Sequence, residues 1–225
     1  MRSLSLLLSL TTLTTAHFTI NYPPSLEGSS IDESKEPNAP CGAIVPSLSS
    51  TDSKFTVTDF HVDGDFISLH SGHPQYNWLF RASVQEVTEG NWTQLYPIVQ
   101  QSGLGDLCSQ KVTAPKGWVG KKGVVGVVGG SGDGTLFQCS VVNFVQGTNS
   151  NKPSSCTNST GVTADYTSDA ELSQLVGEHV EAPVETPAPS AAPSGTSGDK
   201  SAGVVVRGGG LMALGAAVVA GVMIL

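Results

Sequence analysis

Short segments of apolar or alternating apolar and polar residues follow one another through the middle of the chain, and none keeps a helical period for three turns. These segments are 55–62, 66–70, 78–87, 124–128 and 135–145. Apolar side chains recur at every second position from Trp78 to Val84, as in a strand with one buried face. The segment 135–145 is largely apolar on both faces, which predicts a central strand. The pattern therefore predicts an all-β fold.

Clusters of Gly, Pro, Asn and Asp separate these segments and predict turns, with residues 129–134 as a turn-rich connection. Many short strands are most simply accommodated by two packed antiparallel sheets, that is, by a β-sandwich. Residues 169–176 predict one or two helical turns, which we expect to lie outside the domain. From residue 181 to 201 the chain is rich in Pro and Ala, which indicates a disordered stalk.

The N-terminal end has the features of a secretory signal. Arg2 supplies a positive charge, residues 4–13 form an apolar run, and Thr14-Thr15-Ala16 is a small-residue cleavage site. Cleavage after Ala16 makes His17 the first residue of the mature protein. His17 then carries a free α-amine beside its imidazole.

The C-terminal end indicates a lipid anchor. Small residues around Ser197 and Ser201 precede a short spacer and an apolar tail of 15 residues, 211–225. That tail is short for a spanning helix, which needs about 20 residues. The combination is typical of a GPI-attachment signal, with Ser201 as the expected attachment residue and Ser197 as the alternative. A single-pass or tail-anchored protein is the other interpretation. The expected organisation is a signal peptide at 1–16, a β-sandwich domain at 17–160, a low-complexity stalk at 161–201 and a removed propeptide at 202–225.

The composition fits an extracellular domain of a eukaryotic cell. The net charge of −8 and the isolation of the basic pair Lys121-Lys122 exclude a footprint for nucleic acid or anionic lipid. Asn91 and Asn158 each begin an N-glycosylation triplet. Four cysteines without CxxC spacing predict two disulfides rather than a zinc site, and three pairings are possible. The pairing that we expect joins Cys41 to Cys156 and Cys108 to Cys139.

An N-terminal histidine can chelate a metal in a way that no internal residue can. Its amine and its Nδ1 bind one ion together, and one further imidazole completes a T-shaped set of three nitrogens. Such ligands favour Cu(II), and an α-amine with a pKa of about 7.7–8.0 loses its proton readily near neutral pH. The candidate partners of His17 are His61, His70 and His73. We favour His73, because it lies in a turn after a strand and Pro74 restricts its backbone.

Five motifs occur in order along the chain: His17-Phe18, Tyr22-Pro23-Pro24, Pro40-Cys41-Gly42, ISLHSGH at 67–73 and GTLFQC at 134–139. Together they resemble the Bim-type copper acquisition factors of fungi, from residue 17 to about 156 and in the anchor signal. The resemblance implies an immunoglobulin-like β-sandwich related to lytic polysaccharide monooxygenases (LPMOs), with a copper-binding histidine brace but no oxidative cleavage of polysaccharide. Carried over by position, the brace consists of the amine and imidazole of His17 and the imidazole of His73.

One position departs from the family pattern. Members typically continue this segment as Cys-Ala-Asp, and the aspartate is a further copper ligand, whereas this chain has Cys139-Ser140-Val141. Val141 offers no ligand atom. We therefore expect a weaker or more exchangeable Cu(II) site, or one completed by Asp133 or Asn143.

Three functions remain open at this point. The first is a non-catalytic cell-surface protein that captures copper or passes it on, with a copper transporter or a cell-wall glycan as candidate partner. The second is an LPMO-like copper oxidase acting on polysaccharide, although Tyr76, Trp78 and Trp92 form no obvious flat aromatic row. The third is a cell-wall domain that has lost the metal. The motifs of serine hydrolases, zinc proteases and phosphate loops are absent.

Overall fold

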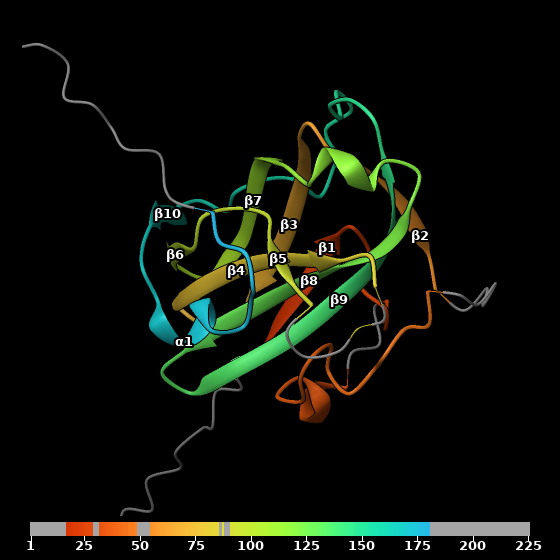
Figure 1. Ribbon diagram of the computed structural model, residues 1–225. Helices are drawn as coiled ribbons and strands as arrows, with labels where there is room; N and C mark the ends of the chain where they lie inside the picture. Colours follow the sequence, from red (N-terminus) through yellow and green to blue (C-terminus); the bar gives the residue numbers. More distant parts are fainter. Residues whose placement is uncertain (1–16, 29–31, 49–54, 86, 88–90, 181–225) are drawn as a thin grey trace, which may run out of the picture. The chain divides into compact units, whose positions relative to one another are not determined.

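Figure 1 shows the computed structural model, which describes residues 17–28, 32–48, 55–85, 87 and 91–180. The strands are β1 (Phe18–Tyr22), β2 (Val57–His61), β3 (Asp65–Ser71), β4 (Gln75–Ser83), β5 (Thr93–Gln94), β6 (Val99–Ser102), β7 (Gly105–Val112), β8 (Lys122–Ser131), β9 (Gly134–Val145) and β10 (Thr163–Tyr166). The helices are η1 (Glu33–Lys35), η2 (Lys116–Trp118) and α1 (Ala170–Ser173). The predicted all-β fold is thus confirmed.

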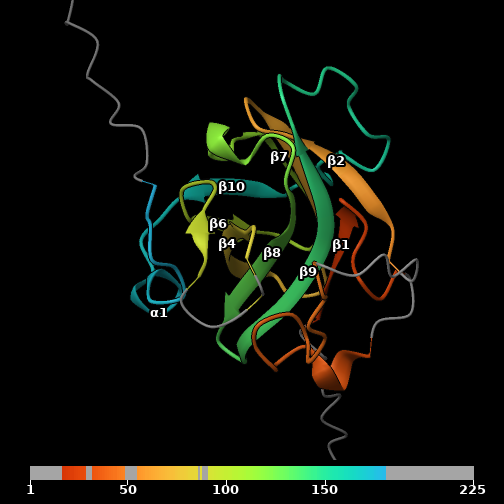
Figure 2. The same cartoon turned by 45° about the vertical axis from the view of Figure 1, so that its right-hand side comes forward.

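The strands form two sheets. The smaller sheet has the order β1-β3-β7, and the larger has the order β10-β6-β4-β8-β9-β2, with β5 paired to β4. Every pair is antiparallel except one, since β2 runs parallel to β9 (Figure 2). The long hairpin of β8 and β9 extends further than the sequence pattern indicates. Residues 129–131 continue β8, and only Gly132 and Asp133 form the turn.

The main core lies between the two sheets. It is made by the inward side chains of both, including Phe18 and Leu69 from the smaller sheet and Trp78 and Phe144 from the larger. Tyr76 stacks on Trp78 with ring centroids 4.4 Å apart. Both rings lie over Gly129 of β8, where a Cβ atom would stand 2.6 Å from the Trp78 ring. A glycine is therefore required beneath this aromatic pair.

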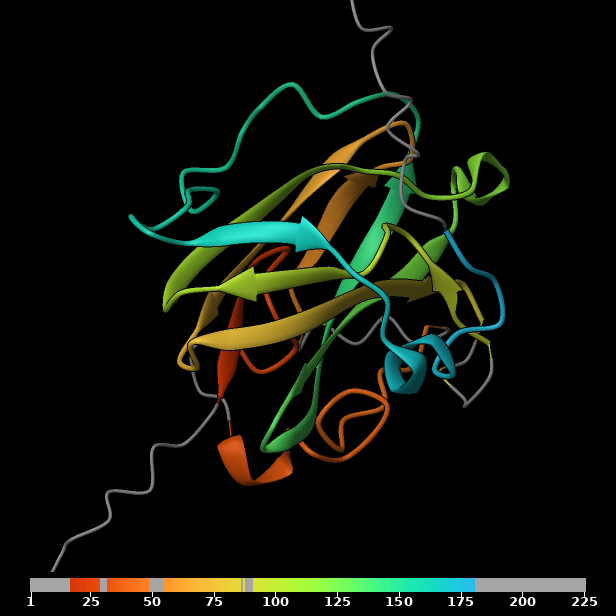
Figure 3. The ribbon, with the colours of Figure 1, turned by 90° about the vertical axis from the view of Figure 1, so that its left-hand side faces the viewer.

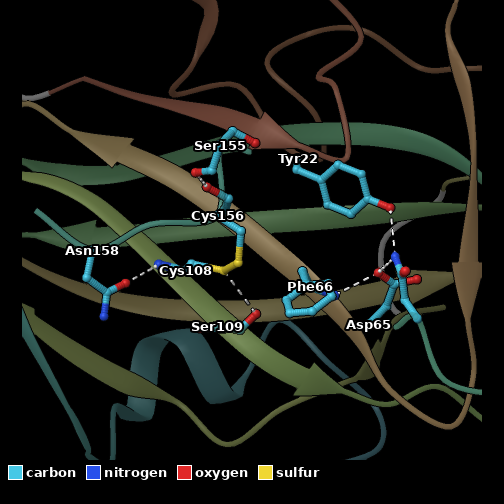
Figure 4. The surroundings of a disulfide bond; sticks show 10 residues. Tyr22, Asp65, Phe66, Cys108, Ser109, Ser155, Cys156 and Asn158 are labelled. Carbon is cyan, nitrogen blue, oxygen red and sulfur yellow. Dashed lines mark hydrogen bonds between the residues drawn. A yellow bond between two sulfur atoms is a disulfide. The ribbon is translucent and has the colours of Figure 1, made fainter. Parts of the chain in front are cut away.

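Both disulfides lie on outer faces of the sandwich. Cys41 is bonded to Cys139 on the outer face of the larger sheet, and Cys108 is bonded to Cys156 on the outer face of the smaller one (Figure 4). The pairing expected from the sequence, Cys41–Cys156 and Cys108–Cys139, is wrong. A bond between Cys108 and Cys139 is impossible in this fold, because the two side chains point away from each other on opposite outer faces of the sandwich.

The fold continues past residue 160, where the sequence pattern placed the start of a stalk. Strand β10 pairs with β6 along its whole length, and the two lie side by side in Figure 3. Asp169 caps α1 by accepting hydrogen bonds from the N–H groups of Glu171 and Leu172. Leu172 and Val176 are buried against the outer face of the larger sheet. The helical turn expected outside the domain is therefore part of it.

Several sequence-based expectations concern the ends and the surface. The signal peptide at 1–16, the Pro-rich stalk from residue 181, and the attachment candidates Ser201 and Ser197 lie outside the described residues. Asn91 and Asn158 are both exposed, as glycosylation would require. Within the described ranges, no helix has the length and apolar character needed to cross a bilayer.

Candidate metal centre

Strand pairing brings the two expected ligands together from distant parts of the chain. Phe18 of β1 is opposite Ser71 of β3, and the N–H of Gly72 donates to the carbonyl of His17 at 3.0 Å. His17 is therefore one position away from His73 across the pair. The adjacency arises because β1 is antiparallel to β3 and both residues lie at the same end of the ladder.

Hydrogen bonds within the turn orient the His73 ring. The Ser71 hydroxyl donates to the His73 carbonyl at 2.7 Å, and Nδ1 of His73 lies 2.9 Å from the carbonyl oxygen of Gln75. The Gln75 N–H donates to the same nitrogen at 3.3 Å. These contacts engage Nδ1 with the backbone of the turn, so Nε2 is the ring nitrogen left to bind a metal.

A carboxylate lies beside a ring nitrogen of each histidine. Nδ1 of His17 is 3.1 Å from Oε2 of Glu33 in η1, and Nε2 of His73 is 3.2 Å from Oδ2 of Asp133 in the β8–β9 turn. Both carboxylates are largely exposed. Nδ1 of His17 is itself buried, and its contact with Glu33 lacks hydrogen-bond geometry, so no described residue satisfies it. An unsatisfied nitrogen at this position fits a metal ligand.

A buried polar pair lies behind β1. Gln138 of β9 accepts a hydrogen bond from the Ile20 N–H at 3.2 Å and donates to the Phe18 carbonyl and to Oε1 of Glu36. Burial raises the pKa of Glu36 to about 7, against the opposing effect of the Gln138 hydrogen bond. Sequence reasoning did not single out Gln138, Glu36 or Glu33. A glutamine inside the apolar run of β9 is the one signal that could have indicated a buried polar contact.

Aromatic side chains pack beneath the two histidines rather than on the surface. The His73 ring meets Tyr76 edge-on, with centroids 5.7 Å apart, and Phe18 packs against Trp78. Burial, with smaller contributions from the charges of Glu36 and Asp133, raises the pKa of Tyr76. Tyr76, Trp78 and Trp92 are all at most 2% exposed, so these three residues offer no platform for a polysaccharide.

The other expected candidates lie elsewhere. His61 pairs with the buried Asp65, and His70 pairs with Asp106 on the outer face of the smaller sheet. Asn143 contacts Asp59, whereas Asp133 is beside His73. In the part of the chain that the structure describes, no three His, Cys, Asp or Glu side chains form a metal-binding group. A brace needs only two side chains, because the α-amine supplies its third nitrogen.

Val141 does not face the candidate centre. It lies opposite Val57 and Val124, towards the end of β9 that is remote from the Asp133 turn, and it is 5% exposed. Its side chain points to the outer face of the sheet, because 138 and 141 differ by an odd number of positions. The expectation that Val141 replaces a ligand of this site therefore finds no support in the geometry.

Comparison with known proteins decides the family. The sequence model of the family described as BIM1-like copper acquisition factors matches residues 15–161, which include both histidines and all four cysteines. The chain belongs to this family. An uncharacterized protein of Aspergillus fumigatus is 31% identical over 167 residues, which are 70% of this chain and 65% of that protein. Membership supports a copper-related function, consistent with nitrogen donors at the candidate centre.

Proposed function

We propose that the processed protein binds one copper ion through the α-amine and Nδ1 of His17 and through Nε2 of His73. The observation that carries this proposal is the β1–β3 register, which brings the two histidines together at one end of the ladder. Two further features support it: the engagement of His73 Nδ1 by the backbone of the turn, which leaves Nε2 for the metal, and the unsatisfied Nδ1 of His17. Copper is then the cargo of the protein.

Asp133 is the carboxylate that we propose as a further ligand. Its Oδ2 lies 3.2 Å from His73 Nε2, and its side chain is 63% exposed. A small shift of the turn brings the oxygen to an ion held by that nitrogen. Because water competes for an exposed carboxylate, such a ligand holds the ion weakly. This suits a protein that has to release what it binds.

The role that these features favour is non-catalytic capture and delivery of copper at the cell surface. Family membership points in this direction, and the burial of Tyr76, Trp78 and Trp92 speaks against an oxidase that binds polysaccharide through them. The sequence supports attachment to a GPI lipid at Ser201, with Ser197 as the alternative. Release of the protein from intact cells by a phosphatidylinositol-specific phospholipase C tests the anchor.

Competition titration with Cu(II) tests the binding site. Protein that begins at His17 is compared with protein carrying one extra residue before His17, with His73→Ala, and with His70→Ala as the matched control. Mutating a residue that only hydrogen-bonds a metal ligand typically lowers metal affinity by about 10–100-fold. Loss of a ligand itself should therefore weaken copper binding by about 100-fold or more. His70 pairs with Asp106 on another face, so His70→Ala should bind as the wild type does. Equal affinity in all four proteins would refute the proposal.

A further inference from the structure

Strand β1 is at the edge of the smaller sheet. The backbone groups of Thr19 and of the preceding residue His17 point towards β3. The backbone groups of Phe18 and Ile20 point the other way, where no strand of the described chain pairs with them. Unpaired backbone groups cost free energy when buried, and a chain terminus frays unless it is held. The free edge of β1 therefore needs hydrogen-bond partners from outside its own sheet.

The Gln138 side chain takes the place of the missing strand. Its amide offers one acceptor and a donor group, as a peptide unit does, and it uses them on the Ile20 N–H and the Phe18 carbonyl. Gln138 comes from β9 of the opposite sheet and is 6% exposed. Its hydrogen bonds therefore join the edge of one sheet to the other across the core.

Glu36 fixes Gln138 from behind. Oε1 of Glu36 accepts from Gln138 Nε2 at 2.6 Å, and the Glu36 carbonyl accepts from the Phe137 N–H at 2.8 Å. The Phe18 N–H also stabilises the charged Glu36 carboxyl. Glu36 is 1% exposed, and the Cys41–Cys139 disulfide binds its segment to the same strand. We call the arrangement of Gln138, Glu36 and the edge groups of Phe18 and Ile20 the edge clasp.

We propose that Gln138 and Glu36 are positioning residues for the copper site, acting through the edge clasp on the residue next to His17. The inference rests on the proposed function. Chelation by His17 requires its amine and imidazole to stay at fixed positions relative to His73, yet His17 is the first residue of the mature chain. The edge clasp holds Phe18 and Ile20, so the preceding residue is ordered before any ion arrives. Such preorganisation raises affinity by lowering the cost of ordering.

The test compares buried-glutamine variants. Gln138→Met keeps the length of the side chain and removes its hydrogen bonds, and Gln138→Glu keeps its shape and removes the donor. The matched control is Gln101→Met, because Gln101 is also fully buried in the larger sheet but bonds Trp78 Nε1 and the Gly103 carbonyl. Glu36→Gln retains an acceptor for Gln138 and serves as the conservative variant.

Two readouts separate the edge clasp from the copper function. In metal-free protein, amide hydrogen exchange at Ile20 should be faster in Gln138→Met, which removes the acceptor of its N–H, with Leu69 of β3 as reference, and unchanged in Gln101→Met. Cu(II) affinity should fall about 10-fold in the Gln138 variants, with an altered EPR spectrum, and stay near the wild-type value in Glu36→Gln and Gln101→Met. A wild-type protein that fails to bind copper refutes the proposed function, whatever the exchange data show. Wild-type binding, with the same affinity and spectrum in Gln138→Met, overturns this inference alone.

Discussion

Glu36 lies in surroundings that its residue type seldom occupies. It is a carboxylic acid with 1% exposure, and one of its oxygens has no hydrogen-bond partner in the described chain. Burial raises its pKa from 4.5 to about 7. Between these two values the folded protein keeps a proton that the unfolded chain has lost. Glu36 therefore contributes stability at low pH that disappears as the pH rises through about 7.

Replacing Glu36 by Gln should remove this pH dependence. A shift from 4.5 to about 7 corresponds to about 3 kcal/mol between the two ends of the window. In metal-free protein, the free energy of unfolding of the wild type should fall relative to Glu36→Gln between pH 5 and pH 8. Thermal or denaturant unfolding at a series of pH values measures the difference. Parallel curves for the two proteins would show that Glu36 titrates normally.

At the residue scale, the sequence predicted the two histidines but not what surrounds them. His17 follows from the cleavage site, and His73 from a turn after a strand and from the family resemblance. Glu36 and Gln138 belong to no repeating pattern, and each is buried only because another part of the chain packs over it. Such contacts join residues more than 100 positions apart, so local periodicity carries no information about them.

At the element scale, alternation of apolar residues identified the strands, whereas their partners had to come from the structure. The segment 135–145 became β9, yet its neighbour β2 is parallel to it and comes from far earlier in the chain. The predicted disulfide pairing was wrong for the same reason, because the face on which each cysteine lies depends on which strands form which sheet. The faces of β9 also decide the role of Val141, which shares the outer face with Cys139 while Gln138 points inward.

The position of Val141 yields a test at this scale. Val141→Asp places a charge at a site that is 5% exposed between Val57 and Val124. It should lower the free energy of unfolding by about 2–5 kcal/mol without strengthening Cu(II) binding. Val57→Asp is the control, because Val57 is the cross-strand partner but is 39% exposed. Denaturant unfolding and copper titration check both. Tighter Cu(II) binding by Val141→Asp would contradict this account and show that residue 141 can act as a copper ligand.

At the scale of the whole molecule, the candidate centre combines residue 17 with three further segments of the chain. His17 contacts Glu33 and His73 contacts Asp133 at one end of the sandwich, because β1 pairs with β3 there and because η1 and the β8–β9 turn flank the pair. Sequence could not place Glu33, and it offered Asp133 only as one of two alternatives. The family resemblance supplied what patterns could not, namely the hypothesis that His17 and His73 belong to one site.

The most direct measurement of the central claim is the number of nitrogen ligands on bound copper. Protein that begins at His17 is loaded with one equivalent of Cu(II), and electron–nuclear double resonance is recorded with and without ¹⁵N labelling confined to the imidazole nitrogens of histidine. The account predicts three directly bound nitrogens, two from imidazoles and one from the α-amine, and the loss of the amine signal when one residue precedes His17. The same spectrum from the extended protein, or a copper ion without the amine, would contradict it.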